Sequence, residues 1–167
     1  NFDFSDVQKN LAFLKGYKTE GNISSQDIAE AIPKSLQDNI FDMTQLLLRG
    51  QIQSVRELVH DLRLQEEDEI KLIAVMLGQF RTYLQVKLLS AQGKSEQQIV
   101  SSLSDYLSRK VNPFQVRYAI RDSRHLSVAF LKTTIKTLVE TDYQIKTGTL
   151  DKDYLLDLAL LKIASNS

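Results

Sequence analysis

Apolar side chains recur every three or four positions along almost the whole chain, which is the spacing of one face of an α-helix. No strand pattern and no internal repeat interrupts it. The helices that the pattern predicts cover 4–14, 24–33, 35–50, 52–62, 66–93, 95–103, 113–124, 127–148 and 151–163. The predicted fold class is therefore all-α, a helical bundle.

A domain boundary is predicted near Pro33–Ser35. The two short helices before it cannot enclose a core of their own, so residues 1–34 are interpreted as the remainder of a small helical domain. Residues 35–167 are expected to form one bundle. Because the chain begins with Asn1 rather than Met, we expect it to be a piece of a longer protein.

The segment 66–93 is predicted to be the longest helix and the centre of the bundle. Its apolar positions form two stripes, which indicates that neighbours cover it on more than one side. The acidic run 66–69 is expected to occupy its first turn, where negative charge suits the helix dipole. Gly78 lies inside this helix, and the close approach of a neighbouring backbone is the expected reason.

Charge is balanced overall but unevenly distributed. Residues 1–70 hold 7 Lys/Arg and 13 Asp/Glu, whereas residues 71–167 hold 14 and 8. Such asymmetry is typical either of a surface that faces a polyanion or of one that docks on an oppositely charged neighbour. The chain has no cysteine, no apolar run long enough to span a membrane and no signal-peptide pattern, so we expect a cytoplasmic protein without a membrane partner.

The motifs that usually mark an enzyme are missing. Neither phosphate-cradling glycine pattern occurs, and His60 and His125 have no second ligand at metal spacing. The sequence 146–148 reads KTG, as in penicillin-recognising serine enzymes, but no Ser has a Lys three residues later to complete that set. We therefore expect no catalytic set, no cofactor and no metal in this chain.

The segment 109–124 is the strongest candidate site, because five of its side chains are Lys or Arg. Val116, Ala119 and Ile120 share one face of the predicted helix. Beside that face lies a basic ridge, formed by Arg117, Arg121 and Arg124. This ridge and Lys146 are the candidates for contact with a partner protein or with a DNA backbone.

A helix-turn-helix made of 95–103 and 113–124 is one interpretation of this basic segment. The connection 104–112 is longer than the three or four residues that this motif uses, and half of the chain is strongly acidic. Both features count against DNA reading.

Asp142 lies within an apolar series and raises a structural question. It pairs either with Lys146, one turn further along the same helix, or with Arg81 across the bundle. The sequence does not choose between these two ion pairs, and both are hypotheses.

Five segments together resemble the delta subunit of the bacterial DNA polymerase III clamp loader. They occur in the family's order and cover nearly all of 35–167. They read SLQDNIFDMTQLLLRGQ (35–51), IKLIAVMLGQFRTYLQVKLLSAQG (70–93), NPFQVRYAIRDSR (112–124), DYQIKTG (142–148) and LALLKI (158–163). Between Leu103 and Val111 the chain has an insertion relative to the family pattern.

The resemblance implies a non-catalytic role within a subunit of a DNA polymerase holoenzyme. Residues 35–167 would be the C-terminal collar domain, which joins the equivalent domains of the other loader subunits. Residues 1–34 would be part of the lid domain. Contact with the sliding clamp would belong to an N-terminal domain that this chain lacks.

Two functional hypotheses follow from the sequence. In the first, the chain is a scaffold that oligomerises with related collar domains and so supports clamp loading in DNA replication. In the second, the basic helix 109–124 binds nucleic acid directly, alone or beside primer–template DNA.

Overall fold

The computed structural model describes residues 35–148 and 150–166. In these ranges all regular secondary structure is helical, so the all-α prediction is confirmed. The helices are α3 (Leu36–Leu48), α4 (Ile52–Leu64), α5 (Glu69–Ala91), α6 (Glu96–Leu107), α7 (Pro113–Ser123), α8 (Val128–Thr147) and α9 (Lys152–Asn166). The helices predicted before Pro33, and with them the lid domain predicted for 1–34, lie outside the described residues.

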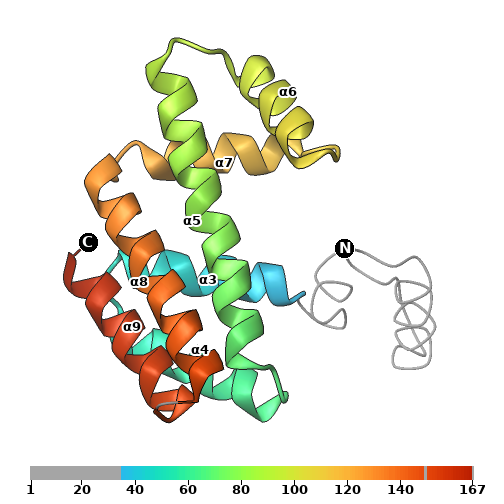
Figure 1. Ribbon diagram of the computed structural model, residues 1–167. Helices are drawn as coiled ribbons and strands as arrows, with labels where there is room; N and C mark the ends of the chain where they lie inside the picture. Colours follow the sequence, from blue (N-terminus) through green and yellow to red (C-terminus); the bar gives the residue numbers. More distant parts are fainter. Residues whose placement is uncertain (1–34, 149, 167) are drawn as a thin grey trace, which may run out of the picture. The chain divides into compact units, whose positions relative to one another are not determined.

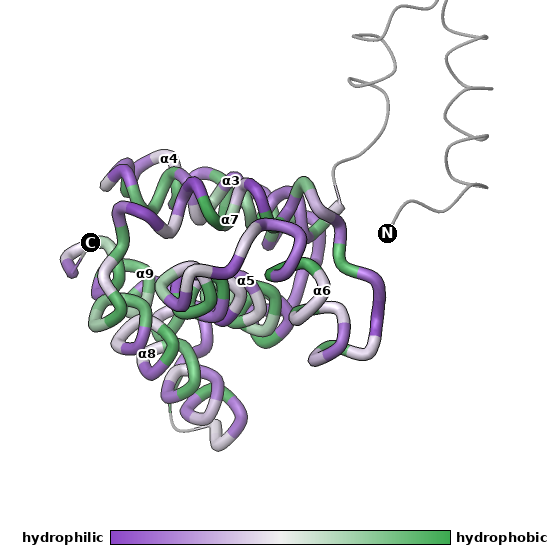
Figure 2. Tube along the Cα trace, turned by 90° about the horizontal axis from the view of Figure 1, so that it is seen from above, coloured by the Kyte–Doolittle hydropathy of each residue, from purple (hydrophilic) through white to green (hydrophobic). Residues whose placement is uncertain are grey.

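Helix α5 is the centre of the compact unit Ile40–Ser167 and packs against α6, α7, α8 and α9. Its 23 residues make it about 35 Å long. Figure 1 shows α3 and α7 crossing behind it, with α8 and α9 alongside. The view from above in Figure 2 places α5 between the layer of α3, α4 and α7 and the pair α8 and α9. The predicted central position of this helix is confirmed.

The core forms around α5 because its buried side chains point to more than one side. Phe80 is fully buried and meets Tyr83 edge-on, with 5.8 Å between ring centroids. Burying one such side chain contributes about 1.5–3 kcal/mol. The other buried apolar residues of α5 are Leu72, Ile73, Met76, Leu77 and Val86.

The helix ends follow capping signals that are legible in the sequence. Ser95 and Gln98 form a reciprocal capping box at the start of α6, and Ser127 Oγ accepts a hydrogen bond from the amide of Phe130 at the start of α8. Gly148 ends α8 with a φ of +69°, a conformation that glycine adopts without steric cost. The bounds 127–148 predicted for this helix are thereby confirmed, with Ser127 and Gly148 as its caps.

The acidic run 66–69 was predicted to occupy the first turn of α5, but most of it lies before the helix. Asp68 is the N-cap, and its Oδ1 accepts a hydrogen bond from the amide of Ile70 at 2.9 Å. Glu66 lies before the helix with a φ of +61°. The short carboxylate of Asp is better suited to capping exposed helix amides than to a position inside a helix. Most of the acidic run therefore lies in the turn before α5.

Helix α6 is longer than the predicted 95–103. It continues through the serine-rich stretch to Leu107 and ends at Ser108 in the left-handed conformation. The hydroxyl of Ser104 accepts a hydrogen bond from the amide of Val111, which folds the following loop back onto the helix. Most of the insertion 104–110 is therefore the last turn of α6 and its cap.

The explanation expected for Gly78 is wrong. A Cβ added at this glycine would meet no atom within 4 Å, so no neighbouring backbone in the described structure requires the small residue. The position is exposed and its φ lies in the ordinary helical region.

Gly78→Ala should therefore stabilise the domain by about 1 kcal/mol, the difference in helix propensity between the two residues. Urea unfolding followed by circular dichroism measures the change. Gly93→Ala is the matched control, because Gly93 has a φ of +79° that alanine adopts only with strain. A loss of stability in Gly78→Ala would contradict the open surroundings of this position.

Candidate functional site

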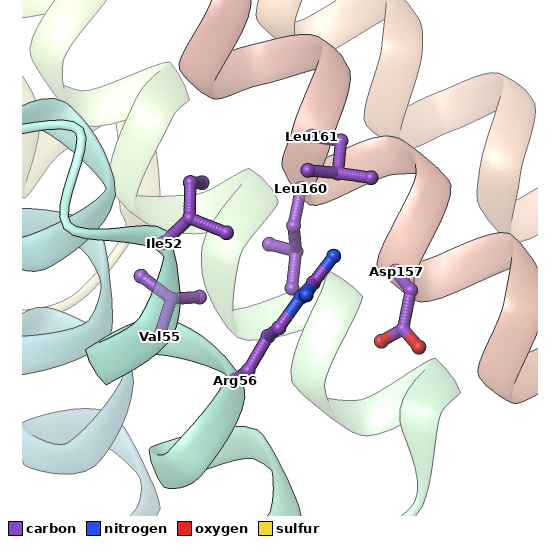
Figure 3. Close-up of a pocket in the computed structure, with 6 residues that line it drawn as sticks. All are labelled: Ile52, Val55, Arg56, Asp157, Leu160 and Leu161. Carbon is purple, nitrogen blue, oxygen red and sulfur yellow. The ribbon is translucent and has the colours of Figure 1, made fainter.

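A small hollow with a mostly aliphatic wall has no room for a ligand. The hollow between α4 and α9 is drawn in Figure 3 and has a volume of about 10 Å³. A cavity of that size holds at most one water molecule. Its wall is largely aliphatic, formed by Ile52, Val55, Leu160 and Leu161 together with Arg56 and Asp157.

A wider groove of about 350 Å³ lies where α4, α5 and α9 meet, and only charged side chains line it. Ligand pockets of this size are predominantly apolar with a few polar groups, so the lining argues against a substrate site. The groove's residues are Arg63, Glu66, Glu67, Asp68, Glu69, Lys152 and Asp153.

Arg63 links the three helices around this groove. Its Nε lies 3.2 Å from Glu69 Oε1 and 3.3 Å from Asp153 Oδ1, and its Nη2 lies 3.2 Å from Asp157 Oδ1. The Glu69 side chain is only 5% exposed and also has Lys152 at 3.7 Å. These contacts tie α4, the start of α5 and α9 together.

The pKa values of Glu69 and Asp153 are shifted in opposite directions. Burial raises the pKa of Glu69, but hydrogen bonds from Asp153, from its own backbone amide and from Arg63 lower that pKa by more, so it falls below the ordinary value. The hydrogen bond to Glu69 raises the pKa of Asp153. We interpret these contacts as a structural ion network, because every partner belongs to a helix of the bundle.

The described residues contain no group of three or more His, Asp or Glu side chains placed to hold a metal ion. Nor does any helix in that part of the chain combine the length and apolarity needed to cross a membrane.

Helix α7 is held on the bundle by contacts along one side and at its end. Of the three residues that share the apolar face, Val116 and Ala119 are buried and Ile120 is half-buried. The carboxylate of Asp122 accepts a hydrogen bond from Gln45 Nε2 of α3 at 2.9 Å. Lys87 Nζ of α5 donates to the backbone carbonyl of Ser123 at 2.9 Å, which satisfies an open carbonyl at the helix end. The helix is thus fixed in orientation.

The outer face of α7 combines exposed aromatic rings with arginines. Phe114 is 62% exposed and Tyr118 is 47% exposed. The Arg117 guanidinium lies over the Phe114 ring at 5.6 Å, and the Arg121 guanidinium lies over the Tyr118 ring at 5.0 Å. We call these four residues the α7 arginine–aromatic surface.

Both arginines of this surface are oriented by carboxylates. Arg117 Nε donates to Glu96 Oε1 of α6 at 3.2 Å, and Arg121 Nε donates to Asp122 Oδ1 at 2.9 Å. Because these bonds use Nε, the terminal Nη groups keep their donors for another acceptor. Within the described residues, no hydrogen bond uses an Nη group of either arginine.

Of the other predicted contact residues, Arg124 directly follows α7, whereas Lys146 lies far from it. Arg124 is exposed and caps the end of α7, close to the start of α8. Lys146 lies in the last turn of α8, about 27 Å away along that helix, so it is not part of the ridge.

Asp142 pairs with Lys146, with Oδ2 and Nζ 2.8 Å apart, and the Asp142 side chain is 23% exposed. No ion pair joins it to Arg81, which is exposed on α5. Of the two pairings drawn from the sequence, the structure contains the local one, because both partners lie one turn apart on the same helix.

The helix-turn-helix interpretation is not favoured by the observed geometry. Helix α6 reaches Leu107, so the connection to α7 is residues 108–112, still longer than the turn of that motif.

Sequence reasoning missed several residues that shape the α7 surface. Glu96 and Asp122 orient the arginines, but Glu96 comes from another helix and its role depends on tertiary packing. A local signal existed for the rings: Phe114 precedes Arg117, and Tyr118 precedes Arg121, by the three residues that bring side chains together on a helix.

Comparison with known proteins decides the family. A family model described as the C-terminal domain of the DNA polymerase III delta subunit matches residues 37–163. The chain belongs to this family. The delta subunit of DNA polymerase III from Bacillus subtilis (strain 168) is 34% identical over 160 residues, which cover 96% of this chain and 44% of that protein.

The solved structure of the Bacillus subtilis DNA clamp loader delta protein has a similar fold. It superposes with a TM-score of 0.83 at 33% identity, over 97% of this chain and 45% of that one. The resemblance read from the sequence is thereby confirmed. The chain spans less than half the length of each of these delta-subunit relatives.

In this delta-subunit domain, Arg63→Ala should lower the free energy of unfolding by about 2 kcal/mol at pH 7. The cost of leaving a buried charge unpaired is larger, about 3–5 kcal/mol, but Arg63 is a quarter exposed and Lys152 still neutralises Glu69. Arg56→Ala, an exposed arginine on the same helix, is the control and should change little.

The loss should also depend on pH. Because the folded pKa of Glu69 is lowered, its contribution is present above the unfolded pKa of about 4.3 and is lost as the pH falls through the folded value. Asp153 acts in the opposite sense, since its raised pKa favours the folded state in acid. Urea unfolding at pH 7 and at pH 3.5 measures both variants. An equal loss at the two pH values would contradict the role of Glu69.

Proposed function

We propose that residues 35–167 form the collar domain of a clamp-loader delta subunit, a non-catalytic scaffold that joins the other loader subunits and so supports sliding-clamp loading in DNA replication. The family match and the likeness to a clamp loader delta protein support this proposal. Contact with the sliding clamp is assigned to the part of the subunit outside this chain, and the assembly acts in the cytoplasm.

The observation that carries the proposal is the α7 arginine–aromatic surface. It is fixed to the bundle on one side and exposes two aromatic rings on the other. Aromatic side chains and arginines are the residue types most enriched where proteins bind one another. The charged groove around Arg63, by contrast, is engaged inside the domain.

Direct binding of nucleic acid by the segment 109–124 remains the second hypothesis from the sequence, and its high Lys/Arg content is the observation in its favour. The paired carboxylates of Glu96 and Asp122 weaken it, because they reduce the positive potential on which phosphate binding depends.

Assembly of the whole delta subunit with its loader partners tests the proposal. The intact subunit should form a complex at micromolar concentrations, and a subunit lacking residues 35–167 should not, because the deletion removes the surface that joins the partners. Light scattering coupled to gel filtration measures the masses. A truncated subunit that assembles as well as the intact one would refute the collar assignment.

A further inference from the structure

The outer side of α7 leaves two large aromatic rings in water although the helix has a well-buried inner side. Phe114 and Tyr118 are exposed, while Val116 and Ala119 of the same helix are buried. Figure 1 shows α7 crossing behind α5. The two rings are on the part of α7 that this packing does not bury. On its other side Tyr118 lies near Phe41 of α3, with ring centroids 6.3 Å apart. Covering such rings with a partner removes apolar area from water and favours association.

The side chains of Arg117 and Arg121 are preorganised, because contacts within the domain already fix their orientation. Each has its Nε held by a carboxylate and its guanidinium carbon over a ring, so less side-chain freedom remains to be lost on binding. The remaining Nη donors suit a carboxylate or phosphate oxygen. The acceptor on the partner is therefore expected to be negatively charged.

The local charge balance favours a protein over a nucleic acid. In residues 95–125, five Lys/Arg side chains stand against three carboxylates, a modest excess of positive charge. Glu96 and Asp122 lie within the surface itself, at 3.2 Å and 2.9 Å from the arginines. Each strand of duplex DNA carries one phosphate per about 3.4 Å of helix axis and would bring several charges close to these carboxylates. One or two carboxylates set among apolar side chains match both the arginines and the rings.

We propose that the α7 arginine–aromatic surface binds an acidic, partly apolar surface of a neighbouring clamp-loader subunit. The inference rests on the proposed function and adds the site of contact and the chemistry of the partner. The rings of Phe114 and Tyr118 pack against the apolar side chains of the partner, and the Nη groups of Arg117 and Arg121 donate to its carboxylates.

The test uses the full-length delta subunit and its co-purified loader partners. Phe114→Ala and the double variant Arg117→Glu with Arg121→Glu should each weaken association by at least about tenfold, as expected for central interface residues. Lys132→Glu with Lys136→Glu, two exposed lysines on α8, is the charge-matched control and should bind like the wild type. Sedimentation velocity measures the affinities, and thermal unfolding verifies that each variant is folded.

Phe114→Ala keeps the test decisive if the charge reversal disturbs folding, since it changes no charge and removes an exposed ring. Variants that assemble like the wild type would overturn the surface assignment while leaving the collar function intact. A wild-type subunit that fails to assemble would instead refute the collar function.

Titration of the same variants with a primer–template DNA shows whether the α7 arginine–aromatic surface binds a protein or a nucleic acid. Loss of DNA affinity with unchanged assembly would overturn the protein partner in favour of nucleic acid. Self-association of the wild-type subunit that the α7 variants abolish would overturn it in favour of a second copy of this chain. Loss of assembly with unchanged DNA affinity is the result expected.

Discussion

The structure depends on one constraint, which is that α5 must be covered on several sides. Its buried residues, Phe80 and Val86 among them, do not lie on a single stripe, so one neighbouring helix cannot remove them all from water. Helices α6, α7, α8 and α9 all pack on it, and α3 joins through the hydrogen bond between Thr44 and Gln79. Each surrounding helix then has an inner face that is committed to α5 and an outer face that is not.

This division of faces separates the contacts that stabilise the bundle from the surface that we propose for binding. Buried polar side chains find their hydrogen-bond partners inside the domain. Among the described residues, no buried side-chain nitrogen or oxygen lacks such a partner. Arg63 is engaged by Glu69, Asp153 and Asp157. The α7 arginine–aromatic surface differs, because its carboxylate contacts orient side chains that still face solvent. A scaffold needs both features: a rigid inside and an outer face that keeps its donors for a neighbour.

Local signals in the sequence were enough to predict the helices and several of their ends. The caps at Ser95 and Ser127 act through residues two or three positions away, so the pattern alone reveals them. The far end of α6 was not predictable, because serines favour helices weakly and the deciding contact, Ser104 with Val111, comes from the folded loop. The same holds for the candidate site. The arginine ridge is visible in the sequence, whereas the orienting carboxylate of Glu96 belongs to another helix and needs the tertiary structure.

The central claim is that this delta-subunit domain is a scaffold that meets its neighbour through the outer face of α7. Hydroxyl-radical footprinting measures the solvent access of individual aromatic side chains, so it tests the claim directly in the assembled loader. Oxidation of Phe114 and Tyr118 should slow severalfold when the full-length subunit joins its partners, while Tyr154, exposed on α9, should react as in the free subunit. Unchanged oxidation of Phe114 and Tyr118 in a fully assembled complex would contradict the account.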